Sequence, residues 1–121
     1  MKYETVCTKI KLKPGSLERA REWAAEINRR AGEALTTLRE EGVVVESVFL
    51  ESGAEGDFLI YYMRAESIER AREAGRASKH AIDEYHHRMM DEICESGRKL
   101  ELLVDLDLSG EAATERMKAE G

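Results

Sequence analysis

The chain has 121 residues, of which 36% are charged and 42% are apolar, a balance typical of one globular domain that buries a core of its own. Its net charge of −6, from 19 basic and 25 acidic residues, argues against a surface for nucleic acid, which would gather lysine and arginine. We therefore expect no nucleic-acid partner.

The two cysteines, Cys7 and Cys94, lie among apolar residues and form no disulfide framework, which indicates a reducing environment. The chain starts directly with an alternating pattern and shows no apolar signal region. No run approaches the roughly 20 apolar residues that a membrane span needs. We expect a cytoplasmic protein with no membrane partner.

Along residues 3–12 apolar and polar side chains alternate, as in a strand with one buried face. A proline and a glycine end this strand, and Ser16 is a candidate N-cap for the clearest helix of the chain. Apolar residues recur at helical spacing from Leu17 onward, and Gly42 suits the left-handed position that ends the helix. Gly32 favours a bend or break within it.

Two further strands are predicted at residues 43–51 and 57–64. The glycine-bounded loop between them, residues 52–56, makes them an antiparallel hairpin. Both faces of this hairpin carry apolar side chains, but helices can cover only one. We expect a second copy of the chain to cover the other face, which predicts a homodimer; the alternative is a monomer with scattered exposed apolar residues.

Ser67 is predicted to cap a short helix that leads into the histidine-rich stretch. A longer helix is then predicted from Asp83 to about Ser96. Leucine and valine alternate with acidic residues over positions 100–108, which predicts a last strand. This strand would complete a domain of residues 1–108, followed by a polar tail, residues 109–121, that is flexible or weakly helical.

The order strand, helix, two strands, helix, strand is the split βαβ arrangement. It predicts an α+β, ferredoxin-like fold in which a four-stranded antiparallel sheet carries helices on one face. Together with the apolar second face of the hairpin, this topology indicates a dimeric α+β barrel.

Segments that match known proteins cover nearly the whole predicted domain. They are residues 10–15, 19–23, 42–51, 62–65, 76–78, 80, 82–83, 85–86 and 100–105. On these residues the chain resembles the dimeric α+β barrel group typified by small antibiotic-biosynthesis monooxygenases. It is more closely similar to a small prokaryotic family known only as a domain of unknown function. The resemblance implies the fold and specifies no reaction, because this fold hosts many.

All three histidines lie within eight positions, residues 80–87. His80, Asp83 and His86 would converge if the backbone turns at the start of the helix, and would then suit a divalent metal or a general base held by an acid. In the alternative reading Asp83 caps the helix, His80 bonds a backbone carbonyl and His86 is half-buried with its own partner. No strong metal-binding spacing is present, so we expect no metal.

His86 lies beside an apolar stripe at helical spacing, formed by Ile82, Tyr85, Met89 and Ile93. We expect burial there to lower the pKa of His86 below its reference value of about 6.5.

Four other residues are candidates for holding a ligand: Trp23, Glu46, Tyr62 and Arg64. Trp23 lies beside the apolar stripe of the first helix, where it would otherwise fill the core. Glu46 interrupts an apolar strand and needs water or a partner, which Arg64 of the paired strand would supply.

Two functions from different classes fit these residues. The first is a small-molecule-binding protein, or an enzyme that needs no cofactor, with a pocket between sheet and helices. His86 would be its base, Asp83 or His80 would orient that base, and Tyr62 or Arg64 would hold the substrate. The second is a non-catalytic dimeric module. The sequence contains no flavin, haem or nucleotide motif, so we expect no cofactor.

Overall fold

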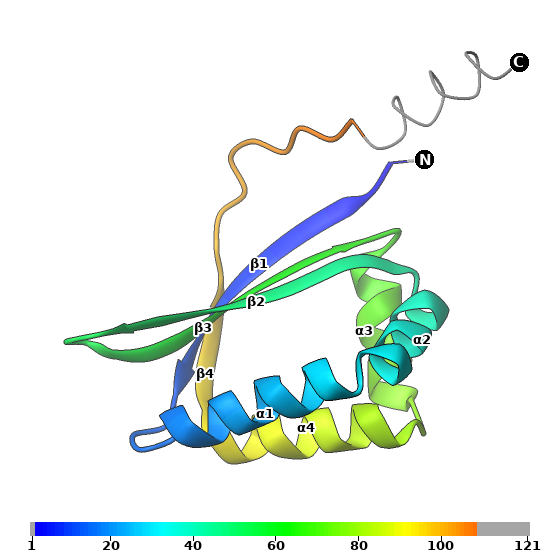
Figure 1. The fold of residues 1–121 in the computed structure, drawn as a ribbon. Helices are drawn as coiled ribbons and strands as arrows, with labels where there is room; N and C mark the ends of the chain where they lie inside the picture. Colours follow the sequence, from blue (N-terminus) through cyan, green and yellow to red (C-terminus); the bar gives the residue numbers. More distant parts are fainter. Residues whose placement is uncertain (1, 109–121) are drawn as a thin grey trace, which may run out of the picture.

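The computed structural model describes residues 2–108, and in this range it shows a four-stranded antiparallel sheet whose one face is covered by helices (Figure 1). The elements are β1 (Glu4–Leu12), α1 (Leu17–Arg29), α2 (Ala31–Glu41), β2 (Val43–Gly53), β3 (Gly56–Ala65), α3 (Ile68–Ala77), α4 (Ala81–Ile93) and β4 (Cys94–Lys99). The strands lie in the order β2-β3-β1-β4. The predicted α+β, ferredoxin-like fold is confirmed; the predicted tail, 109–121, lies outside the described residues.

The three long strands form because apolar and polar residues alternate along them. On the face toward the helices, Val6 and Leu12 of β1 and Leu59 of β3 are buried. The β2–β3 hairpin turns between Gly53 and Gly56, and Gly56 has a φ of 123°, a conformation that side chains disfavour. The predicted hairpin is therefore present, in the predicted place.

The long helix predicted from Leu17 is two helices in the structure. The break is at Arg30, which leaves helical geometry with φ −106° and ψ 33°, two residues before Gly32. The left-handed cap at Gly42 is present as expected, with φ 73°. Because of the break, α1 and α2 cover different parts of the sheet.

Two clusters of buried side chains result. Trp23 of α1 packs in the larger one against β1, β3 and α4, together with Leu12, Leu59, Met89 and Ile93. Leu38 of α2 packs against the smaller cluster of Val43, Ala65 and Ala71. Each cluster joins helices to the same face of the sheet, so the space between the two clusters lies between the sheet and the helices.

The helix that carries the histidines starts and ends earlier than predicted. Ser67 caps α3 as expected, its hydroxyl accepting a hydrogen bond from the backbone N–H of Arg70 at 3.2 Å. His80, not Asp83, is the residue before α4, and Asp83 lies within the first turn. The helix ends at Ile93, because the chain turns directly into β4 at Cys94.

The last strand was predicted at residues 100–108, and this prediction was wrong. The strand that pairs with β1 is Cys94–Lys99. The backbone N–H of Lys13 donates to the carbonyl of Ile93 at 2.8 Å, so the end of α4 is held beside the end of β1 and pairing begins at once. Gly97 lies within this strand and pairs with Ile10, whose Cγ1 would lie 3.4 Å from a Cβ added at Gly97.

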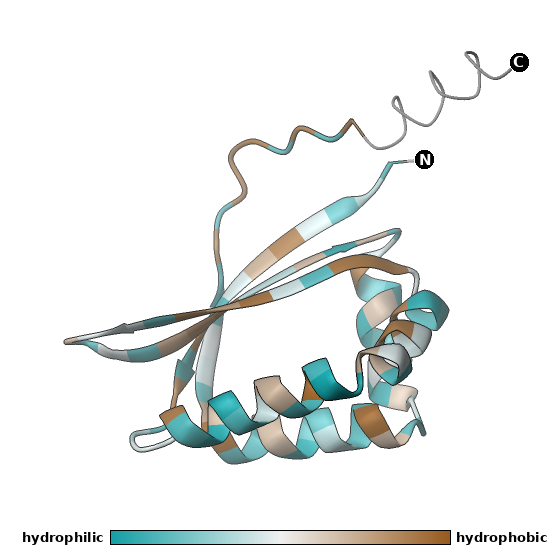
Figure 2. Cartoon of the chain, viewed as in Figure 1, coloured by the Kyte–Doolittle hydropathy of each residue, from teal (hydrophilic) through white to brown (hydrophobic). Residues whose placement is uncertain are grey.

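After one more backbone bond, from Leu100 N–H to the Cys7 carbonyl at 2.8 Å, the chain leaves the sheet. Residues 101–108 have no regular structure. Figure 2 shows apolar and polar residues alternating along this segment, and its large apolar side chains are exposed, Leu106 at 88%. The sheet face away from the helices is also partly uncovered, with Phe49 63% exposed. We call this the outer face.

Candidate functional site

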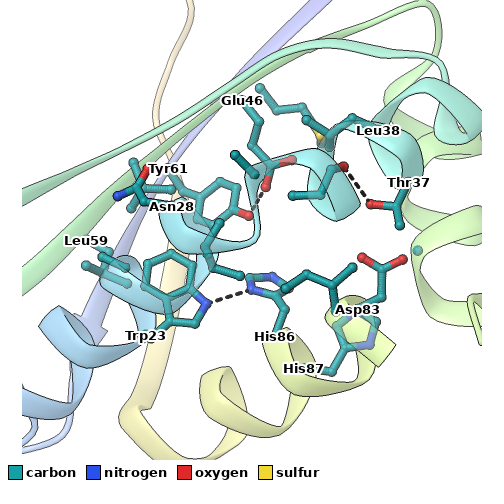
Figure 3. Close-up of a pocket in the computed structure, with 18 of the residues that line it drawn as sticks. Trp23, Asn28, Thr37, Leu38, Glu46, Leu59, Tyr61, Asp83, His86 and His87 are labelled. Carbon is teal, nitrogen blue, oxygen red and sulfur yellow. Dashed lines mark hydrogen bonds between the residues drawn. The ribbon is translucent and has the colours of Figure 1, made fainter. Parts of the chain in front are cut away.

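A cavity of about 640 Å³ lies between the sheet and the helices. Residues from β2, β3 and all four helices line it. Apolar side chains dominate the lining, among them Ile27, Leu38, Val48, Leu59, Met63 and Ile82. A small set of polar and aromatic groups projects among them, and Figure 3 shows the main ones: Trp23, Glu46, Tyr61, Asp83 and His86. A mostly apolar cavity with a few convergent polar groups is the usual form of a small-molecule site.

Trp23 and His86 form one side of the polar set. Trp23 is only 4% exposed, and its indole Nε1–H donates to Nδ1 of His86 at 3.1 Å (Figure 3). The bond joins α1 to α4, and the two ring centroids lie 5.6 Å apart. Since buried indole N–H groups need an acceptor, this contact fixes both rings.

The pKa of His86 is lowered to about 4, chiefly because burial disfavours the charged ring. The neighbouring His87 acts in the same direction, and the carboxylate of Asp83 opposes it. The direction agrees with the sequence-based expectation, and the ring is neutral at pH 7. His87 itself is exposed, although its ring lies 5.6 Å from that of His86.

Tyr61 and Glu46 form a second polar pair, and the ring centroid of Tyr61 lies 6.2 Å from that of His86. The hydroxyl of Tyr61 on β3 donates to Oε1 of Glu46 on β2 in a very short hydrogen bond (Figure 3). Burial raises the pKa of Glu46, while the bond from Tyr61 partly offsets this. Burial and the nearby Glu46 carboxylate raise the pKa of Tyr61 well above its usual value. Burial thus raises the pKa of both members of this pair, and a buried carboxyl group with a raised pKa is a candidate for proton transfer.

Glu41, at the end of α2, also lines the cavity. Burial first, and then the carboxylates of Asp83 and Glu46, raise its pKa to about 7. Asp83 accepts a hydrogen bond from the Ser78 hydroxyl at 2.5 Å. One end of the cavity thus carries three carboxyl groups, and within residues 2–108 none of them forms an ion pair with lysine, arginine or histidine.

The structure brings together only some of the predicted site residues. Trp23, Glu46, Asp83 and His86 line the cavity. His80 does not: its Nε2 lies 2.7 Å from Oε2 of Glu40 at the surface, and that carboxylate raises the pKa of His80. His80 and Asp83 share instead a smaller, separate pocket at the start of α4.

Tyr62 and Arg64 lie on the outer face, away from the cavity. The Arg64 Nε–H donates to the Tyr62 hydroxyl at 3.1 Å, and its two terminal nitrogens pair with Asp105 and Asp107. The expected pair of Arg64 with Glu46 is wrong, because β2 has a bulge between Val43 and Val45 that makes Val45 the partner of Arg64. Glu46 then lies opposite Met63 and faces the helices.

Sequence reasoning missed two residues of the site, Tyr61 and Glu41. Tyr61 could have been found, since it alternates in phase with Leu59 and Met63 on the face toward the helices. Glu41 gave no comparable signal. In a helix whose charged residues are mostly solvated, only its position beside Asp83 and Glu46 distinguishes it.

Within residues 2–108, no group of three or more histidine, cysteine or acidic side chains is placed to hold a metal ion. None of the helices described is both long and apolar enough to cross a membrane.

The strand order and the helices on one face of the sheet define a ferredoxin-like α+β protein of the type found in dimeric α+β barrels. Comparison with known proteins gives the family: residues 3–110 match the model of DUF6176, a family of unknown function, and the chain belongs to that family. The sequence matches no curated protein.

Solved structures are similar in fold. L-rhamnose mutarotase from Formosa agariphila has a TM-score of 0.61 and 17% identity, covering 86% of this chain and 99% of its own. A putative antibiotic biosynthesis monooxygenase from Bacteroides thetaiotaomicron has a TM-score of 0.53 and 18% identity, over 86% and 90%. Another, from Nitrosomonas europaea, has a TM-score of 0.51 and 13% identity, over 81% and 85%. These likenesses confirm the resemblance to the monooxygenase group on the level of the fold.

Proposed function

We propose that the protein binds a small molecule in the cavity between sheet and helices. The observation that carries this proposal is the cavity itself: about 640 Å³, with an apolar lining and the polar groups Trp23, Glu46, Tyr61 and His86 directed into it. This volume lies within the range of about 300–1,000 Å³ common for ligand pockets.

The polar groups also support proton transfer without a cofactor. Burial raises the pKa of Glu46, and the Tyr61 hydroxyl holds its carboxyl group in place, so Glu46 is the candidate for exchanging a proton with a bound molecule. Glu46 and His86 both line the cavity, so a bound molecule would lie near both a carboxyl group and an imidazole. A neighbour named L-rhamnose mutarotase and two named as putative monooxygenases are consistent with a small-molecule substrate in this fold.

Ligand screening by thermal shift tests the binding function. A ligand at about 100 times its dissociation constant stabilises the folded chain by about 2.7 kcal/mol. Ala34→Phe places a ring in the cavity, since Ala34 lines it, and should abolish stabilisation by a hit. Ala25→Phe is the matched control, because Ala25 is exposed on α1 and lies outside the lining. A hit that stabilises the Ala34→Phe protein as well as the wild type binds elsewhere, and the proposal then fails.

A second function, a non-catalytic dimeric module, is favoured by the apolar surface outside the cavity. Val45 and Phe49 are exposed on the outer face. Beside it runs the segment 101–108, which Arg64 holds through Asp105 and Asp107 and whose leucines are exposed. Two copies that pack these surfaces together would form a homodimer. Sedimentation tests this, and a species of 13.7 kDa at micromolar concentration would exclude the dimer.

A further inference from the structure

The hydrogen bond between Trp23 and His86 has a fixed direction. An indole nitrogen carries a hydrogen and has no lone pair to accept with, so Trp23 Nε1 is the donor. Nδ1 of His86, 3.1 Å away, must therefore be the acceptor and carry no proton. Trp23 is 4% exposed, so breaking the bond would leave a largely buried donor without its partner.

The other ring nitrogen, Nε2, then carries the single proton of the neutral ring. No residue between 2 and 108 forms a hydrogen bond with it. Fully buried side-chain nitrogen and oxygen atoms in this part of the chain all have partners, so Nε2 is in contact with solvent space. Since His86 lines the cavity, and Figure 3 shows its ring between Trp23 and the Tyr61–Glu46 pair, the Nε2–H group is presented to the cavity.

We propose that Trp23 is a positioning residue that holds His86 in the Nε2–H form, so that the cavity takes a neutral ligand whose carbonyl oxygen accepts a hydrogen bond from His86. The inference rests on the proposed binding function and names the ligand class for that same cavity. It gives His86 the role of a donor, because the lone pair that a base would use is already bound to Trp23.

The acidic side chains around the cavity disfavour anionic ligands. Glu41, Glu46 and Asp83 line it from α2, β2 and α4, and a carboxylate ligand would have to lie beside them. The cationic groups of the lining are Arg21 on α1 and Arg72 and Arg76 on α3, and all three are exposed. Water screens their charge, so they compensate little for repulsion inside the cavity. His87 also lines the cavity and is exposed, so it too compensates little for the acidic side chains.

The first experiment needs no ligand. Long-range ¹H–¹⁵N spectra at pH 7 distinguish a protonated from an unprotonated imidazole nitrogen, and the signals missing in His86→Gln identify His86. We expect Nε2 to carry the proton in the wild type and Trp23→Phe to give a mixture of both forms. A wild-type ring protonated on Nδ1 overturns the inference and leaves the binding function standing.

The second experiment compares three probes of similar shape by NMR titration: acetophenone, α-methylstyrene, which lacks the oxygen, and benzoate. We expect His86→Phe to reduce the ratio of acetophenone to α-methylstyrene affinity by about tenfold, the effect of one good hydrogen bond. Benzoate should bind at least about tenfold more weakly than acetophenone.

The other possible results of this titration contradict either the ligand class or the binding function. An unchanged ratio in His86→Phe, or binding of benzoate as tight as that of acetophenone, contradicts the assigned ligand class. Because the ratio compares two probes in one protein, it holds even if the variant is less stable. Absence of binding by every probe, with the Nε2–H form confirmed, contradicts the binding function instead.

Discussion

Tyr61 and Glu46 lie on neighbouring strands and are joined by a hydrogen bond inside the cavity, although the residues directly opposite each other are Tyr61 with Val48 and Glu46 with Met63. The contact is diagonal across the hairpin, and it gives the buried carboxyl group of Glu46 a partner. It also joins two groups whose pKa values are raised by burial.

Removing the Tyr61 hydroxyl should therefore destabilise the fold. In Tyr61→Phe the carboxyl group of Glu46 stays buried without its partner, and we expect a loss of about 1–3 kcal/mol in urea unfolding at pH 7. Tyr62→Phe is the matched control, because Tyr62 lies on the outer face and bonds Arg64. Equal losses in the two variants would contradict the buried Tyr61–Glu46 contact.

His86 should make stability depend on pH on the acid side. Its pKa is about 4 in the folded chain and near 6.5 when unfolded, so between these values the unfolded chain binds more protons. Stability should fall as the pH drops from 6.5 to 4, by up to about 3 kcal/mol. His86→Gln should remove most of this loss in urea titrations, and His87→Gln should retain it. The same slope in wild type and His86→Gln would show that His86 is not buried.

Glu41 should have the opposite effect on the pH dependence of stability: it should make the fold less stable as the pH rises from 4.5 to 7. Its pKa is about 7 when folded and 4.5 when unfolded, so between these values the folded chain binds more protons. The free energy of unfolding that Glu41 contributes is therefore greatest below pH 4.5, and it is lost as the pH rises to 7. Glu41→Gln should raise stability at pH 7 relative to the wild type, as judged by the melting temperature. Glu40→Gln, at the exposed neighbouring position that pairs with His80, should not. A lower melting temperature for Glu41→Gln would contradict the electrostatic repulsion among the three carboxyl groups.

The homodimer proposal predicts that a charge on the outer face weakens association. Phe49→Glu places a carboxylate where an apolar side chain is 63% exposed. We expect the sedimentation coefficient at micromolar concentration to fall to that of a monomer, because an unpaired charge would be buried in the interface. Ala25→Glu, on an exposed helix surface, should leave it unchanged. A dimer unaffected by Phe49→Glu would use another surface.

Much of the fold could be predicted from local patterns. Alternation gave β1, β2 and β3, and the capping residues Ser67 and Gly42 lie where expected, because these signals depend on neighbouring residues. The position of β4 could not be predicted in this way. The leucines after Lys99 alternate more regularly than the residues of β4 itself, and the bond from Lys13 to Ile93 that fixes the strand joins distant parts of the chain.

Only part of the site could be predicted, because some of its features depend on neighbouring residues and others on contacts between distant parts of the chain. The burial of His86 follows from helical spacing, but its bond to Trp23 joins α1 to α4. Tyr62 was chosen in place of Tyr61, an error of one position that moves a side chain to the other face of a strand. The bulge in β2, which turns Glu46 toward the helices, has no clear signal in a run of three valines.

Trp23 allows a direct test of whether the cavity is the ligand site, because it is the only tryptophan in the chain. Its indole N–H gives a single resolved signal in a ¹H–¹⁵N spectrum, and the group lies in the cavity lining bonded to His86. A compound found by thermal shift should move this signal along a titration curve with the dissociation constant that the thermal shift implies. A compound that stabilises the protein and leaves the Trp23 signal in place would contradict the cavity as its binding site.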